Sequence, residues 1–226
     1  MIMRGGAASV WMRWQSDVVE ETTWSEVAAA IEAAPYPMEI LSADPTAASD
    51  CLTALGMTTK SWLGALVANS GGLVADHGWL RILGSGHTGL PDVASAAQIA
   101  QKRLVVGFDV MGGQYAWFQP EPADKPTVHY FGPDTLDWQN LGQGYADWLY
   151  AVLAGSLTGF YETLRWPGWE QEVALLTLDQ GISVWPPPWS AEGNDVGAAS
   201  RKAIPLAQLV AFYEDTAVQL GSATDA

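Results

Sequence analysis

Five glycines fall within the sixteen residues from Gly71 to Gly86, together with an aspartate, a histidine, a tryptophan and an arginine. Glycine adopts positive φ angles without strain and lets two backbones approach closely, so this density does not suit a helix interior. We refer to residues 71–86 as the glycine-rich block. The block predicts short strands separated by tight turns, with Asp76, His77 and Gly78 forming one of the turns.

Short strands dominate the middle of the chain, and helices are expected on either side. Alternation and turn residues predict strands at 38–41, 73–75, 79–83, 104–110, 114–119 and 127–131. Helical periodicity and capping residues predict helices beginning near Thr23, Pro45, Ser61, Asp92, Tyr145, Phe160 and Pro205. The sequence therefore predicts an α+β fold, an antiparallel β-sheet meander covered by N-terminal and C-terminal helices.

A single domain is expected over residues 20–221, ending in a helix over 205–220. Residues 1–19 show no clear period and are expected to form an extended leader, and 222–226 a disordered tail. With 49% hydrophobic residues, the chain can form a core without disulfides or metal. Its one cysteine, Cys51, is interpreted as a small core residue and excludes an intramolecular disulfide.

Acidic side chains greatly outnumber basic ones. The 226 residues carry 25 Asp and Glu against 10 Lys and Arg, a formal net charge of −15. Such a surface repels nucleic acid and anionic membranes, so neither is expected as a partner, whereas a basic protein would be attracted. No stretch approaches the roughly 18 apolar residues of a membrane span, and no clear secretory signal is present. The expected compartment is the cytoplasm, and the oligomeric state is left open.

The sequence contains no established catalytic or metal-binding motif, and no cofactor is expected. The three histidines are far apart, and no HExxH or CxxC spacing occurs. Ser85 is interpreted as a turn residue, and the GxGxxG match at 84–89 is weak because no strand–helix alternation surrounds it. The tryptophans favour core packing over a sugar site. The carboxylates that a sugar hydrolase could pair are Asp76, Asp109, Asp134, Asp137 and Glu170.

Several motifs together resemble one bacterial family. They are 58–65, the glycine-rich block, 109–113, 130–138 and a segment with Phe160, Tyr161, Leu164, Arg165, Trp166 and Trp169. Over most of residues 20–190 they resemble the domain-of-unknown-function family 2625 (DUF2625), which has no established activity to carry over. The order of elements is also similar, more weakly, to the SUKH superfamily, whose α+β domains include many immunity proteins against nuclease toxins. That second resemblance is a fold-level analogy.

Two functions are compatible with these observations. The favoured one is a non-catalytic acidic interaction module, an immunity-type binder of a basic protein, with no catalytic and no metal-binding residue. The alternative is a small-ligand-binding protein or hydrolase with a cleft around the glycine-rich block. In that cleft Asp76 or Asp109 would act as a base and Arg81 would hold an anion. The residues expected to line the cleft are Asp76, His77, Trp79, Arg81 and Asp109.

Overall fold

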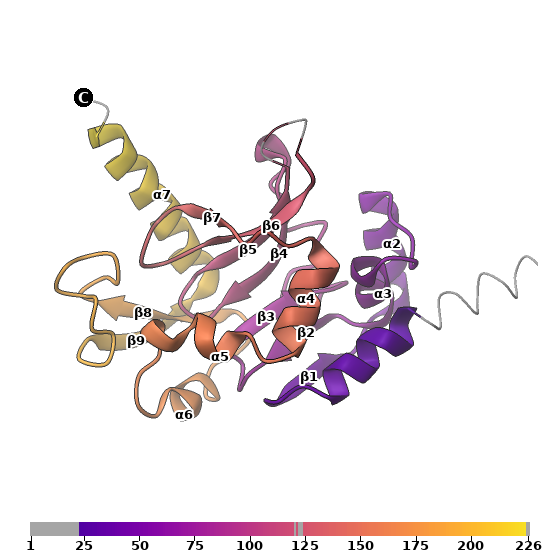
Figure 1. The fold of residues 1–226 in the computed structure, drawn as a ribbon, viewed down its shortest axis with the longest axis horizontal. Coiled ribbons are helices and arrows are strands. Elements are labelled where there is room, and N and C mark those ends of the chain that lie inside the picture. The colour runs from indigo at the N-terminus through magenta and orange to yellow at the C-terminus, as the bar shows by residue number, and fades with distance from the viewer. Residues whose placement is uncertain (1–22, 120, 122–123, 225–226) are drawn as a thin grey trace, which may run out of the picture.

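The centre of the protein is a seven-stranded antiparallel sheet, in which each strand pairs with the next along the chain (Figure 1). The structure is a computed structural model that describes residues 23–119, 121 and 124–224. The strands are β1 (Met38–Leu41), β2 (Gly72–Ala75), β3 (Leu80–Leu83), β4 (Leu104–Asp109), β5 (Gln114–Phe118), β6 (Thr127–Phe131) and β7 (Trp138–Asn140). A second sheet consists of β8 (Gln180–Trp185) and β9 (Ser200–Pro205). The α+β class and the antiparallel meander are thereby confirmed.

Helices flank the sheet, as the sequence predicts. A first helix covers 23–32. The others are α2 (Pro45–Leu55), α3 (Trp62–Asn69), α4 (Tyr145–Leu153), α5 (Leu157–Phe160), α6 (Trp169–Val173) and α7 (Leu206–Thr224), with 3₁₀ turns η1 (Ile99–Gln101) and η2 (Glu162–Leu164). The boundaries of α2 follow from its caps: the Asp44 carboxylate accepts the N–H groups of Thr46 and Ala47, and Gly56 ends the helix at φ 61°.

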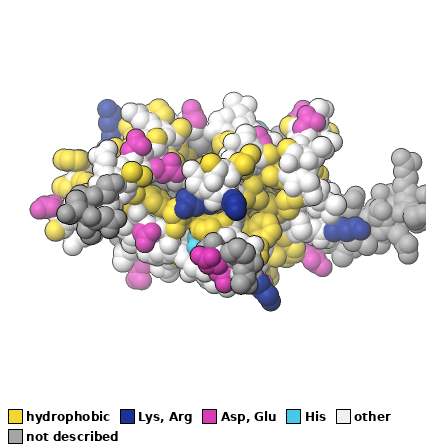
Figure 2. Space-filling model, turned by 90° about the horizontal axis from the view of Figure 1, so that it is seen from above, with side chains coloured by type: hydrophobic (Ala, Val, Ile, Leu, Met, Phe, Trp, Pro, Cys, Tyr) yellow, Lys and Arg dark blue, Asp and Glu magenta, His cyan; other side chains and the backbone are white. Residues whose placement is uncertain are grey.

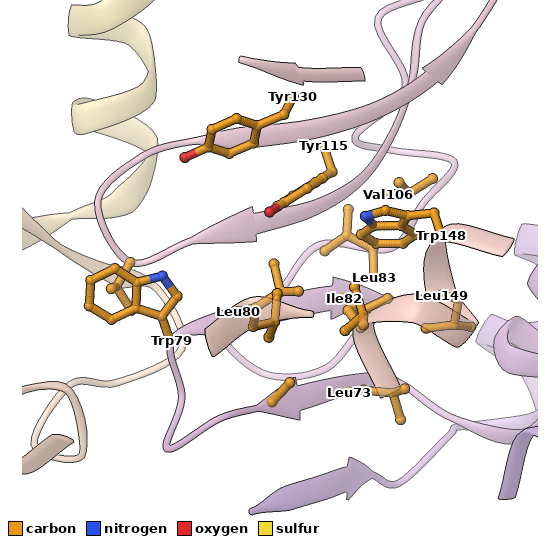
Figure 3. Close-up of a cluster of buried hydrophobic side chains, with 14 of the residues drawn as sticks. Leu73, Trp79, Leu80, Ile82, Leu83, Val106, Tyr115, Tyr130, Trp148 and Leu149 are labelled. Carbon is orange, nitrogen blue, oxygen red and sulfur yellow. The ribbon is translucent and has the colours of Figure 1, made fainter. Parts of the chain in front are cut away.

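The two faces of the sheet are covered by different parts of the chain. Tyr115 and Tyr130 are paired on the first face, where they lie with Trp148 of α4 in the main core (Figure 3). Successive side chains of a strand point to opposite faces, so Phe131 belongs to the second face. There Phe131 packs against Leu209 and Tyr213 of α7. The segment that follows α6 and the β8–β9 sheet complete this second side.

The helix predicted to begin near Asp92 is absent. No α-helix forms over 92–101, because the Asp92 carboxylate instead accepts the N–H groups of Ala94 and Ser95 in a turn, and only η1 is helical. Asp134, one of the carboxylates that a sugar hydrolase could pair, lies in a turn before β7.

The C-terminal helix is longer than the sequence predicts. Helix α7 extends to Thr224, past the end expected at 220 and into the tail expected to be disordered. The predicted leader over 1–19 and residues 225–226 lie outside the described residues. Cys51 is buried as expected, with 4% of its surface exposed.

Candidate functional site

The turn between β2 and β3 presents one side chain outward and holds another inward. Asp76, His77 and Gly78 all have positive φ angles, of 53°, 58° and 94°. Asp and Gly tolerate this region better than most residues, which explains why this short turn is built from them. His77 is exposed, whereas only 4% of Asp76 is accessible. The turn therefore contributes an imidazole to the surface and a carboxylate to the interior.

The buried Asp76 carboxylate is held by an arginine that lies 89 residues further along the sequence. Arg165 forms an ion pair with Asp76, and only 11% and 6% of the two side chains are exposed. The Arg165 guanidinium carbon lies 4.1 Å from the ring centroid of Trp169 and 4.9 Å from that of Trp79. We call these four residues the Arg165 cluster. It fixes α6 against the β2–β3 turn by a buried charge pair and cation–π contacts.

Asp109 is completely buried, with 0% of its surface exposed. Its Oδ1 accepts the N–H groups of Met111 at 2.8 Å and Gly113 at 2.9 Å. Its Oδ2 accepts the hydroxyls of Tyr130 at 2.7 Å and Tyr161 at 3.0 Å. Burial raises the pKa of the Asp109 carboxyl, and these hydrogen bonds oppose that effect. All four donors belong to the protein, so Asp109 organises the β4–β5 turn.

A surface cavity of about 570 Å³ lies beside the glycine-rich block, on the second face of β1–β3. One wall is formed by strands β1–β3 with the β2–β3 turn and His87, and the other by residues that follow α6. The lining residues are Pro37, Met38, Glu39, Leu41, Val74, His77, Gly78, Arg81, His87, Val173, Ala174, Leu176, Thr177 and Leu178. Because the second wall follows α6, the Arg165 cluster fixes one side of this cavity. We call it the Arg81 cavity.

Arg81 lines the cavity and forms no ion pair among the described residues. Only 2% of its surface is exposed, and Nη1 donates to the Gln180 carbonyl of β8. In the described part of the chain no carboxylate lies within ion-pair distance of Arg81, and its Nε has no hydrogen-bond partner. Burial lowers the pKa of the guanidinium to about 10, so it is still charged at neutral pH. The negative charges of Asp109 and Asp179 oppose this shift, but neither carboxylate forms an ion pair with Arg81. A buried cation without a contacting anion is costly, which makes an anion in the cavity a favourable partner.

The five residues predicted for a cleft are thus divided between two environments. His77 and Arg81 line the cavity, whereas Asp76, Trp79 and Asp109 are buried among protein partners. Glu39 and His87 also line the cavity, and neither is among the five residues that the sequence predicts for it. Glu39 lies on the short edge strand β1, and only the antiparallel register places it on the face of Arg81.

The described residues contain neither a cluster of metal ligands nor a membrane-spanning helix. Over residues 23–119, 121 and 124–224, no group of three or more His, Cys, Asp or Glu side chains could hold a metal ion. In the same part of the chain, no helix is both long and apolar enough to cross a membrane.

Comparison with known proteins identifies the family. A model described as "Protein of unknown function DUF2625" matches residues 11–209. The chain belongs to this family. It is 36% identical over 196 residues to the uncharacterized protein YbfG of Escherichia coli (strain K12), covering 84% of this chain and 89% of the relative. An uncharacterized protein of Haemophilus influenzae is 31% identical over 171 residues, covering 71% and 75%.

No solved structure matches this chain. The resemblance to SUKH domains therefore stays a prediction, while the resemblance to the DUF2625 family is confirmed. Two of the family motifs, the glycine-rich block and the 160–169 segment, meet in the Arg165 cluster and so lie beside the Arg81 cavity.

Proposed function

We propose that this protein binds a small anionic ligand in the Arg81 cavity. The observation that carries the proposal is the buried side chain of Arg81, a residue that lines the cavity and forms no ion pair with a carboxylate in the described residues. An arginine donates through several N–H groups in a fixed plane, which suits a carboxylate or phosphate group. The hydrogen bond from Nη1 to Gln180 holds that plane in place before a ligand arrives.

Two imidazoles can complete the anion site. His77 and His87 both line the Arg81 cavity, and both are exposed. Each imidazole carries at least one N–H donor whatever its charge. The hydroxyl in the cavity lining, that of Thr177, donates to the Asp179 carboxylate at 2.6 Å rather than to an imidazole, so we propose binding rather than hydrolysis.

Thermal unfolding and calorimetry with phosphate and acetate test the proposal. A ligand that binds only the folded protein raises its stability, by about 2.7 kcal/mol at a hundred times Kd. We expect this stabilisation in the wild type and a loss of it in Arg81→Met. The matched control is Lys202→Met, which removes an exposed cation and the same unit of charge.

A surface variant keeps the test valid if Arg81→Met fails to fold. His87→Ala removes an exposed side chain of the cavity and should weaken anion binding while leaving the fold intact. The proposal would be overturned if phosphate and acetate stabilised the wild type and both cavity variants equally. It would also be overturned if neither anion stabilised the wild type.

A second candidate function rests on the distribution of exposed charge. The described residues include fifteen exposed Asp and Glu side chains but only four exposed basic ones, all lysines. Figure 2 shows acidic side chains spread among hydrophobic ones over one face, without a single patch. We propose on this basis that the protein can act as an acidic interaction module for a basic protein, the immunity-type role that the SUKH resemblance implies. Such binding would be electrostatically steered.

The salt dependence of a purified complex tests this second function. A basic protein recovered from the host on the immobilised chain would be repurified, and its association rate measured at several NaCl concentrations. We expect the rate to fall about tenfold or more between low and physiological salt, because steering is screened over about 8–10 Å. Recovery of no basic protein, or a rate independent of salt, would contradict the interaction-module proposal.

A further inference from the structure

The Arg81 cavity contains a negative charge as well as a positive one. Glu39 of β1 is directly opposite Val74 of β2, and Val74 is directly opposite Arg81 of β3. Residues opposite one another in a sheet project from the same face, so Glu39 and Arg81 share one side. Both line the Arg81 cavity.

The two charges do not neutralise each other directly. Neither Glu39 nor Arg81 has an ion-pair partner among the described residues. One strand separates them, and neighbouring strands lie about 4.8 Å apart, so their Cα atoms are roughly 10 Å apart. A ligand between them can pair with the cation through an anionic group and with the carboxylate through a cationic group.

The remaining wall is largely apolar. Val173, Leu176 and Leu178 form it on the side opposite the sheet, and Met38 and Val74 contribute from β1 and β2. A ligand that fills the cavity therefore needs a hydrophobic portion in addition to its charges.

We propose that the Arg81 cavity selects a zwitterion with an apolar side chain, such as a free α-amino acid or the ends of a short peptide. The inference rests on the proposed binding of an anion by Arg81. The carboxylate of the ligand pairs with Arg81, its ammonium group pairs with Glu39, and its side chain contacts Leu176 and Leu178.

The net charge of the protein favours the same ligand class. A chain with a formal charge of −15 repels a free anion as it approaches. A zwitterion has no net charge and so does not meet that repulsion. Glu39, which opposes a simple anion at the site, becomes an attractive partner for the ammonium group.

Three matched probes test the assignment by calorimetry on the full chain. Norleucine carries the carboxylate, the ammonium group and the chain; hexanoate lacks the ammonium group; pentylamine lacks the carboxylate. We expect norleucine to bind about tenfold more tightly than hexanoate, the effect of one charge-assisted hydrogen bond. Pentylamine should bind more weakly than norleucine.

The variant Glu39→Gln gives the sharpest readout because it should affect the binding of norleucine and of hexanoate differently. It should weaken norleucine binding about tenfold and leave hexanoate binding unchanged or stronger, since a like charge is removed. The matched control Glu32→Gln removes an exposed carboxylate on the 23–32 helix, outside the cavity, and should change neither.

The outcomes separate this inference from the proposed function. Equal affinities for norleucine and hexanoate, or a Glu39→Gln variant that discriminates like the wild type, overturn the zwitterion assignment and leave the anion site standing. If the protein binds phosphate or acetate but neither norleucine nor hexanoate, the zwitterion assignment is likewise overturned and the anion site stands. If no anion binds, including phosphate and acetate, both the zwitterion assignment and the proposed anion site are overturned.

Discussion

Asp109 is a candidate catalytic base in the sequence, but its contacts in the structure give it a structural role. A carboxylate beside a turn is a reasonable candidate base, but all the hydrogen bonds described for Asp109 come from the protein itself. Two of those donors, Tyr130 and Tyr161, lie on separate elements, so the sequence around Asp109 gives no sign of them. A catalytic base needs an oxygen that can accept a proton or hydrogen bond from its substrate. Both carboxylate oxygens of Asp109 already accept hydrogen bonds from the protein.

Asp109→Asn should therefore destabilise the protein without touching the Arg81 cavity. The substituted amide places an N–H₂ group against hydroxyl or amide donors, and a buried unsatisfied group costs about 1–3 kcal/mol. Urea denaturation followed by circular dichroism measures the change. The control Asp50→Asn lies on the exposed side of α2 and should stay within about 0.5 kcal/mol of the wild type. Equal stabilities for the two variants would contradict the structural role.

Arg165→Met should be more damaging, because it leaves the Asp76 carboxylate buried without its cation. Removing one partner of a buried ion pair costs about 3–5 kcal/mol. Asn tolerates the positive φ of residue 76, so Asp76→Asn is a conservative second variant. We expect the double variant to be more stable than the sum of the single losses implies. Additive losses in this double-mutant cycle would show that the two side chains do not interact.

Elements with strong local signals were predictable, and those without were not. The caps at Asp44 and Ser61 and the alternation in β4 to β6 depend on residues close in sequence, and these elements are confirmed. Strand β7 is only three residues long, and β9 has a mostly exposed, polar pattern, so neither carries the alternation of a half-buried strand. Their pairing is set by tertiary contacts.

The same limit applies to the candidate site. His77 and Arg81 were predictable because they lie in one conspicuous block. Glu39 was not, since β1 reaches that block only by pairing with β2 across an intervening pair of helices. The wall that contains Leu176 and Leu178 comes from another distant segment, held by the Arg165 cluster. Sequence alone could suggest one side of the cavity, and the fold was needed to supply the other.

Gly84→Ala tests why the glycine-rich block contains glycine. A Cβ at residue 84 would lie 2.5 Å from the Ser70 carbonyl oxygen and 2.8 Å from the Gly72 nitrogen, both backbone atoms that cannot swing aside. We expect a loss of about 1–3 kcal/mol or more in the free energy of unfolding. Gly159→Ala is the matched control, because its Cβ meets nothing within 4 Å on a short helix. That change should be neutral or stabilising.

At the scale of the whole molecule, folding makes the surface more acidic than the composition suggests. Arg81 and Arg165 are held inside, and Arg103 and Arg201 are only partly exposed, stacked over Trp138 and Trp166. The exposed carboxylates are consequently opposed by few exposed cations, and two ion pairs are found among the described residues. Mutual repulsion of surface charge thus opposes the folded state.

Added NaCl should therefore stabilise the protein. Raising the salt from about 20 mM to about 500 mM shortens the screening length to a few ångströms, and with it the reach of the repulsion. An effect of about 1 kcal/mol would raise Tm by about 2–4 °C for a chain of this size. The combined variant Asp50→Lys and Glu192→Lys replaces two exposed carboxylates by cations and should reduce the dependence of Tm on salt. A Tm that falls with added NaCl would mean that attraction within the ion pairs outweighs repulsion across the surface, and an acidic surface would then be a weaker basis for steering a basic partner.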